Sequence, residues 1–173
     1  MIVVATTPGR EDWLRQCLSS INRPVLVLSD FTYELGKINW LFHNTKIKRF
    51  LFLQDSVVIK NQGLFDLLDD GHGSISLTND PCMYGMYLGI YERQILEQVE
   101  IPIPESKSEA INYELTWTES YCQKAKNVKL AFTDLSDKRA TNKITLFGRE
   151  NLVLENEYLI KYKSNWGQKP ALD

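Results

Sequence analysis

The chain has 173 residues, a mass of 20.0 kDa and a formal net charge of −2. Its 43% hydrophobic and 24% charged residues form an ordinary globular composition, which excludes a disordered chain and a fibrous repeat. No apolar run approaches the roughly 18 residues of a membrane span. The first residues lack the pattern of a signal peptide. We therefore expect a cytoplasmic protein with no transmembrane segment.

The cysteines carry no recognisable motif, whereas the charges are distributed unequally along the chain. Cys17, Cys82 and Cys122 lie far apart and give neither a disulfide framework nor a zinc motif. Residues 1–120 carry 10 basic and 16 acidic groups, whereas residues 121–173 carry 10 basic and 6 acidic groups. This asymmetry is typical either of a solvated surface or of a site for an anionic ligand or acceptor near the C-terminal segment.

Short apolar runs alternate with amphipathic stretches along the chain. In order, we expect a strand at 2–5, a helix at 10–21, a strand at 25–28, a helix at 35–44, a strand at 50–53 that continues at 57–59, a short helix at 63–68, strands at 74–77 and 83–90, helices at 91–99 and 107–124, a strand at 128–132, a loop at 134–143 and a terminal helix at 151–163. Ser106 and Glu109 have the spacing of a capping box at the start of the helix at 107–124.

This alternation predicts an α/β fold with a mostly parallel central sheet. In such sheets, ligands bind outside the carboxyl ends of the strands. Those ends are expected at Thr6–Arg10, Ser29–Asp30 and Gln54–Ser56. The sequence therefore predicts a ligand crevice at this edge of the sheet.

Four stretches of the sequence carry a family resemblance. They are Val3–Arg10 with the helix behind it, Leu35–Lys37 with Asn44, Phe50–Ile59, and a weaker closing segment with Tyr158, Lys161, Trp166 and Gly167. In residue type, order and separation, the first three resemble the nucleotide-binding half of GT-A-fold glycosyltransferases. The last is similar to a closing segment found in many members of that family.

The resemblance implies a GT-A-like (Rossmann-like) three-layer sandwich in a single domain, residues 1–173. Residues 1–60 would form the nucleotide-binding half, residues 74–132 the acceptor half, and residues 133–173 a loop and a C-terminal helix. The implied activity is transfer of a sugar from a nucleotide-diphosphate donor, with a UDP-sugar as the expected donor and Mn²⁺ or Mg²⁺ as the expected cofactor.

The resemblance also implies a set of donor-binding residues along the predicted edge. They are Thr6, Thr7, Pro8, Arg10, Asp30, Lys37, Asp55, Lys161 and Lys163. Two of them have ordinary structural alternatives. Asp30 can serve turn chemistry with Thr32, and Lys37 can be a solvated lysine at a helix start.

Asp55 is the predicted metal ligand. It follows a strand of Phe and Leu residues, where a carboxylate is costly unless it is bound to something. Family members hold Mg²⁺ or Mn²⁺ between two carboxylates, but here the flanking positions are Gln54 and Ser56. Three alternatives stay open: weak metal binding through Asp55 and the substrate phosphates, replacement of the metal by basic residues (Arg149, Lys161 or Lys163), or an inactive site.

Glu109 and Glu114 are the candidate general bases that would deprotonate the acceptor hydroxyl. Both lie on the predicted helix at 107–124, where ordinary solvated glutamates are the alternative and a capping role explains Glu109 by itself. Tyr84 and Tyr87 are the candidate acceptor platform, since sugars and bases stack on aromatic rings. Core packing is the alternative for this aromatic segment.

These features lead to a compact glycosyltransferase as the first hypothesis. Its acceptor is not identified by the sequence and can be a glycan, a protein or a nucleic acid, including modified bases of viral DNA. The alternative is a catalytically weakened nucleotide-binding module on the same fold. A nucleotidyltransferase is disfavoured, because no Gly-rich triphosphate loop follows the first strand.

Overall fold

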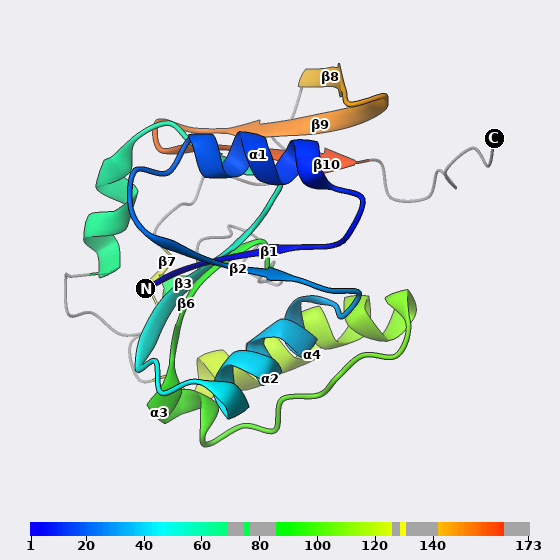
Figure 1. Ribbon diagram of the computed structural model, residues 1–173. Helices are drawn as coiled ribbons and strands as arrows, with labels where there is room; N and C mark the ends of the chain where they lie inside the picture. The colour runs from blue at the N-terminus through cyan, green and yellow to red at the C-terminus, as the bar shows by residue number, and fades with distance from the viewer. Residues whose placement is uncertain (69–74, 77–85, 126–128, 131–141, 165–173) are drawn as a thin grey trace.

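The computed structural model describes residues 1–68, 75–76, 86–125, 129–130 and 142–164, which form two sheets and the helices packed on them (Figure 1). The larger sheet has six strands in the order β2-β1-β3-β6-β5-β7, and the smaller has four in the order β4-β10-β9-β8. The strands are β1 (Ile2–Thr6), β2 (Val25–Ser29), β3 (Arg49–Gln54), β4 (Val57–Ile59), β5 (Ile75–Ser76), β6 (Leu88–Glu92), β7 (Lys129–Leu130), β8 (Asn142–Leu146), β9 (Arg149–Glu155) and β10 (Leu159–Ser164). The helices are α1 (Glu11–Ser19), α2 (Glu34–Asn44), the 3₁₀ helix η1 (Gln62–Leu68), α3 (Arg93–Leu96) and α4 (Lys107–Lys124).

Three neighbouring parallel strands form one half of the larger sheet. β1 pairs with β2 and β3 on either side, in a register that sets Thr6 beside Ser29 and Ala5 beside Gln54. The apolar runs of β1 and β3 are buried, as expected for strands covered on both faces. The carboxyl ends of these strands therefore meet at one edge, here called the carboxyl edge. Beyond β3, strand β6 runs antiparallel to its neighbours.

The C-terminal segment forms strands, so the predicted helix at 151–163 is wrong. These residues lie in β9 and β10, which pair antiparallel with each other, while β10 also pairs with β4. Buried and less buried positions do not follow a helical period here, and Asn156 interrupts the segment. Its Oδ1 accepts two backbone hydrogen bonds that close the turn between the strands.

The two faces of the larger sheet are covered differently. Figure 1 shows α1 and the smaller sheet on one face, and α2, α3 and α4 on the other. Apolar side chains fill both spaces, with Leu53 and Phe65 in one core cluster and Phe52 and Trp117 in the other. The expected three-layer sandwich is not confirmed in its simple form, because an antiparallel sheet takes part of one outer layer. What the structure shows is a mixed α/β fold around a mostly parallel sheet.

The remaining helices agree with the sequence except for the one predicted at 91–99. The helices predicted at 10–21, 35–44 and 107–124 are confirmed as α1, α2 and α4. The helix predicted at 91–99 is wrong at both ends, because the helix found there, α3, covers only Arg93–Leu96. Tyr91 lies in β6, and its ring packs against Trp117 and Tyr121 in the core. Residues 83–85, 134–141, Trp166 and Gly167 lie outside the described residues.

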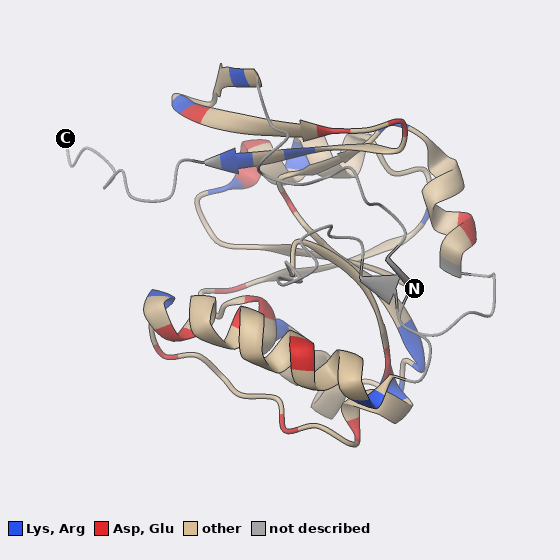
Figure 2. Cartoon of the chain, turned by 180° about the vertical axis from the view of Figure 1, so that it is seen from behind, with Lys and Arg blue, Asp and Glu red and all other residues tan. Residues whose placement is uncertain are grey.

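Charged side chains are distributed unequally between the layers. Figure 2 shows basic residues on β10, toward its C-terminal end, and acidic residues on α4 and the segment before it. The basic residues of β10 are Lys161 and Lys163, and the acidic residues of α4 include Glu109 and Glu114. Among the described residues, none of the helices has the length and apolar character that crossing a membrane requires.

Candidate functional site

The candidate site lies at the carboxyl edge, where the loop between β1 and α1 meets the turn between β3 and β4. β1 ends at Thr6 and leads through a loop into α1, and β3 ends at Gln54 and leads directly into β4. β4 belongs to the smaller sheet and pairs with β10, with Val57 beside Lys161. This pairing brings the C-terminal Lys161 next to Gln54–Ser56, although more than a hundred residues separate them along the chain.

Asp55 is buried and bound by two residues of the first loop. Arg10 forms a bidentate ion pair with it, donating from Nε to Oδ2 at 2.7 Å and from Nη2 to Oδ1 at 2.6 Å. Thr6 Oγ1 donates to Oδ2 at 2.7 Å. Charge-assisted, bidentate bonds of this kind are the strong ones in proteins. The carboxylate that the sequence singles out therefore fastens the β1–α1 loop to the end of β3.

Lys161 is bound to the residues on either side of Asp55. Its Nζ donates to Gln54 Oε1 at 2.6 Å and to Ser56 Oγ at 2.5 Å, and it lies 5.1 Å from the centre of the Tyr87 ring. Burial lowers the pKa of Lys161 to about 7, helped by the positive charges of Lys163 and Arg10 and opposed by the negative charges of Asp55 and Glu34.

A third group of contacts ties α2 to this arrangement. Gln54 Nε2 donates to Glu34 Oε1 at 2.5 Å, so Gln54 connects Glu34 to Lys161. Glu34 is not among the predicted site residues, and no local pattern signals it, because the contact joins the start of a helix to the end of a strand from another part of the chain.

Asp30, in the turn between β2 and α2, is bound by residues of that turn and of α2. Asp30 Oδ1 accepts hydrogen bonds from the backbone N–H and the hydroxyl of Thr32, and it also pairs with Lys37 Nζ at 3.0 Å. Burial alone would raise the pKa of Asp30, but the bonds from Thr32 and Lys37 lower it below its ordinary value. Lys37 is buried, so it is not the solvated lysine considered above.

The two candidate bases occupy different surroundings. Glu114 Oε1 accepts a hydrogen bond from the Met86 backbone N–H at 2.7 Å. Burial raises the pKa of Glu114, with an opposing effect from that bond and further effects from Glu34, Lys161 and Lys163. Glu109 is exposed and accepts from the backbone N–H of Glu105 at 2.8 Å, as a helix-capping residue does. The positive charges of Lys161 and Lys163 act on Glu114.

The other predicted residues are spread between surface and core. Thr7 is half-buried, Pro8 is exposed, and Lys163 is half-buried on β10. Tyr87 is buried with its ring beside Lys161, so it does not present an open platform, and its acceptor role stays a prediction. Tyr84 lies outside the described residues. Arg149 is exposed at the start of β9.

The residues around Asp55 do not fit a divalent cation. Both carboxylate oxygens are bound by Arg10 and Thr6, and the oxygens of Gln54 and Ser56 that flank them accept from an ammonium group. Mn²⁺ and Mg²⁺ prefer charged oxygen ligands. Within the described parts of the chain, no group of three or more His, Cys, Asp or Glu side chains could hold a metal ion.

Comparison with known proteins finds similarity in structure alone. No protein-family model matches the sequence, and no curated protein matches it. The crystal structure of A197 from STIV is 11% identical with a TM-score of 0.53, and the match covers 99% of this chain and 98% of that one. S. aureus TarS is 15% identical with a TM-score of 0.52, covering 79% of this chain and 35% of TarS. An active-site mutant of LgtC is 9% identical with a TM-score of 0.47, covering 78% of this chain and 73% of LgtC.

TarS and LgtC are glycosyltransferases. At such identities, the likeness to TarS shows the fold alone, and this fold is GT-A-like. It agrees with the fold expected from Val3–Arg10 and Phe50–Ile59, and it leaves donor and acceptor open.

Proposed function

We propose that this protein is a glycosyltransferase that binds a nucleotide-diphosphate sugar, with UDP as the first nucleotide to test, at the carboxyl edge of the larger sheet. The observation that carries the proposal is the cluster of Arg10, Asp55 and Lys161, which gathers three buried or half-buried charges at the ends of β1 and β3. Ligands of α/β sheets bind at such edges, and a buried lysine whose pKa burial lowers to about 7 is typical of a functional site.

The β1–α1 loop is the proposed wall for the nucleotide. Thr7, Pro8 and Gly9 are exposed or half-buried there, and Gly9 has a φ of 85°, which lets the backbone turn sharply toward α1. Asp30 at the end of β2 keeps 42% of its side chain exposed, so it can still accept a hydrogen bond from a ribose or a base.

Glu114 is the proposed general base. In the transfer, the acceptor hydroxyl oxygen bonds to the anomeric carbon of the sugar, and its proton passes to the Glu114 carboxylate. The bond from that carbon to the diphosphate oxygen breaks, and its electron pair leaves with the nucleoside diphosphate. A carboxyl whose pKa is raised by burial suits this proton transfer near neutral pH.

The test is release of nucleoside diphosphate from a panel of UDP-, GDP- and CDP-sugars, with water and then with candidate glycans as acceptors. We expect release from one donor, and loss of at least about a hundredfold in rate in Glu114→Gln, the usual effect of removing a general base. Glu119→Gln, an exposed residue of the same helix, is the matched control and keeps the wild-type rate.

A nucleotide-binding module without transferase activity is the second candidate. The observation that favours it is that the oxygens of Asp55 are already bound by Arg10 and Thr6. Binding of a nucleotide diphosphate without release from any donor would support the module. Failure of every nucleotide to bind would contradict both candidates.

A further inference from the structure

We propose that Lys161 and Arg10 form a built-in cationic site for the diphosphate of the donor, so that nucleotide binding needs no divalent metal ion. This inference rests on the proposed function, because it names the groups that would hold the diphosphate at the same edge.

The first observation is a buried ammonium group that has no carboxylate partner. Lys161 is 4% exposed, and both of its hydrogen-bond acceptors, in Gln54 and Ser56, are neutral oxygens. Across the described residues, no Asp or Glu forms a salt bridge with its Nζ. A buried charge that no carboxylate contacts directly is disfavoured, and burial lowers the pKa of Lys161 although Asp55 and Glu34 oppose that shift from a distance. An apolar side chain of equal length would avoid that penalty. An anion that binds beside Nζ explains why a lysine stands here.

The second observation is unused donor capacity. An ammonium group has three N–H donors, and two of those of Lys161 are directed to the described acceptors. Arg10 uses Nε and Nη2 on Asp55, and its Nη1 makes no hydrogen bond to a described residue. The Arg10 side chain is 27% exposed, so that its remaining donors can reach a ligand.

The third observation is the arrangement of the local charges. Arg10 and Asp55 neutralise each other as an ion pair. Lys161 and Lys163 are basic, and the carboxyl groups of Glu34 and Glu114 lie close enough to offset them. The hydrogen-bond donors of Arg10 and Lys161, rather than a net positive charge, would therefore hold the anion. A diphosphate carries negative charge on both phosphoryl groups, so it offers acceptor oxygens to Arg10 and to Lys161 together.

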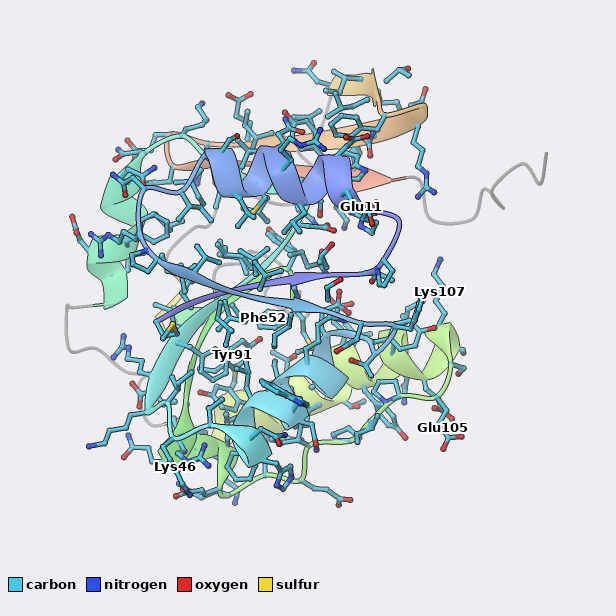
Figure 3. All side chains as sticks on the ribbon, viewed as in Figure 1. Glu11, Lys46, Phe52, Tyr91, Glu105 and Lys107 are labelled. Carbon is cyan, nitrogen blue, oxygen red and sulfur yellow. The ribbon has the colours of Figure 1, made fainter. Side chains whose placement is uncertain are left out.

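The experiment is a calorimetric titration of the full chain with UDP, GDP, CDP, ADP and inorganic pyrophosphate, in EDTA and again with MnCl₂. We expect at least one nucleotide to bind equally well in both buffers. Lys161→Met should weaken that binding by about 10- to 100-fold, the usual value of a charged hydrogen bond. Lys46→Met is the matched control and should bind like wild type, because Figure 3 shows Lys46 at the opposite end of the molecule from Glu11 and Lys107.

A stability measurement separates a binding role from a structural one. Lys161→Met should melt no lower than wild type, because it removes a buried charge and keeps the chain length. If Met at this position leaves the Ser56 hydroxyl without its hydrogen-bond donor and the variant is unstable, Lys161→Gln takes its place, because Gln keeps a hydrogen-bond donor and removes the charge. When MnCl₂ is added to the wild type in the absence of nucleotide, electron paramagnetic resonance should also detect no Mn²⁺ bound to the protein.

The outcomes distinguish the inference from the proposed function. Nucleotide binding that requires Mn²⁺, or that is equal in wild type and Lys161→Met, overturns the inference and leaves the proposed function standing. Binding of pyrophosphate but of none of the four nucleotides contradicts the assignment to a nucleotide donor. No binding of any probe overturns both.

Discussion

Removing the guanidinium of Arg10 is expected to destabilise the protein strongly. Asp55 is almost fully buried, and Arg10 supplies two of its three side-chain hydrogen bonds. In Arg10→Met, the carboxylate keeps only the bond from Thr6. Breaking one side of a buried ion pair costs about 3–5 kcal/mol. Arg10 is itself 27% exposed and Lys161 lies nearby, so the lower end of that range applies.

A loss of about 3 kcal/mol corresponds to a fall in melting temperature of roughly 6–12 °C for a chain of this size. The assay is urea denaturation, which gives the free energy of unfolding of each variant. Arg15→Met is the control, because Arg15 pairs with Asp12 on the same helix while both side chains are exposed. Such a surface pair contributes at most about 1 kcal/mol.

A double variant sharpens the test of this ion pair. Arg10→Met combined with Asp55→Asn removes the stranded charge, so we expect it to be more stable than Arg10→Met alone. Equal stabilities for Arg10→Met and Arg15→Met would contradict this role of Arg10, because Asp55 would then not depend on Arg10 in the folded protein.

Three further predictions concern other residues. Burial raises the pKa of Glu114 above 4.5 in the folded state, so its contribution to stability is complete below pH 4.5 and is lost as pH rises through the raised pKa. Glu114→Gln should therefore melt at a higher temperature than wild type near neutral pH, and at no higher temperature in acid. A melting-temperature difference between variant and wild type that is the same at both pH values would contradict this. Gly36→Ala should lower the melting temperature although alanine favours helices by about 1 kcal/mol, because its Cβ would lie 2.6 Å from the Cβ of Thr32; a stabilised variant would refute that clash. Burial raises the pKa of Cys17 to about 12, so peptide mapping after iodoacetamide at pH 8 should find this thiol alkylated only in denatured protein.

The first third of the fold follows from local patterns. The apolar runs of β1 and β3 and the helical spacing of α1 and α2 are strong signals, and they place Asp55 at a carboxyl edge. The cost of a buried carboxylate also predicts that Asp55 is bound to something. That its partner is Arg10 is a matter of side-chain direction in a loop, which no periodicity encodes.

The C-terminal part of the site could not be predicted in the same way. Lys161 reaches Gln54 and Ser56 only because β10 pairs with β4, and that pairing depends on β9 and β10 being strands. The weak closing-segment resemblance includes Lys161, but no local pattern says that this lysine, rather than Lys163 or Arg149, meets Gln54 and Ser56. Long-range strand pairing makes that choice, and it lies outside any local window.

The most direct test of the central claim is a thermal-shift titration of the wild-type chain with UDP, GDP, CDP and ADP. At a hundred times its dissociation constant, a nucleotide that binds only the folded state adds about 2.7 kcal/mol of stability, or roughly 5–11 °C for a chain of this length. At least one nucleotide should give such a rise, and the rise should increase with nucleotide concentration. An unchanged melting temperature with all four nucleotides, at concentrations far above the usual affinities of donor sites, would contradict it.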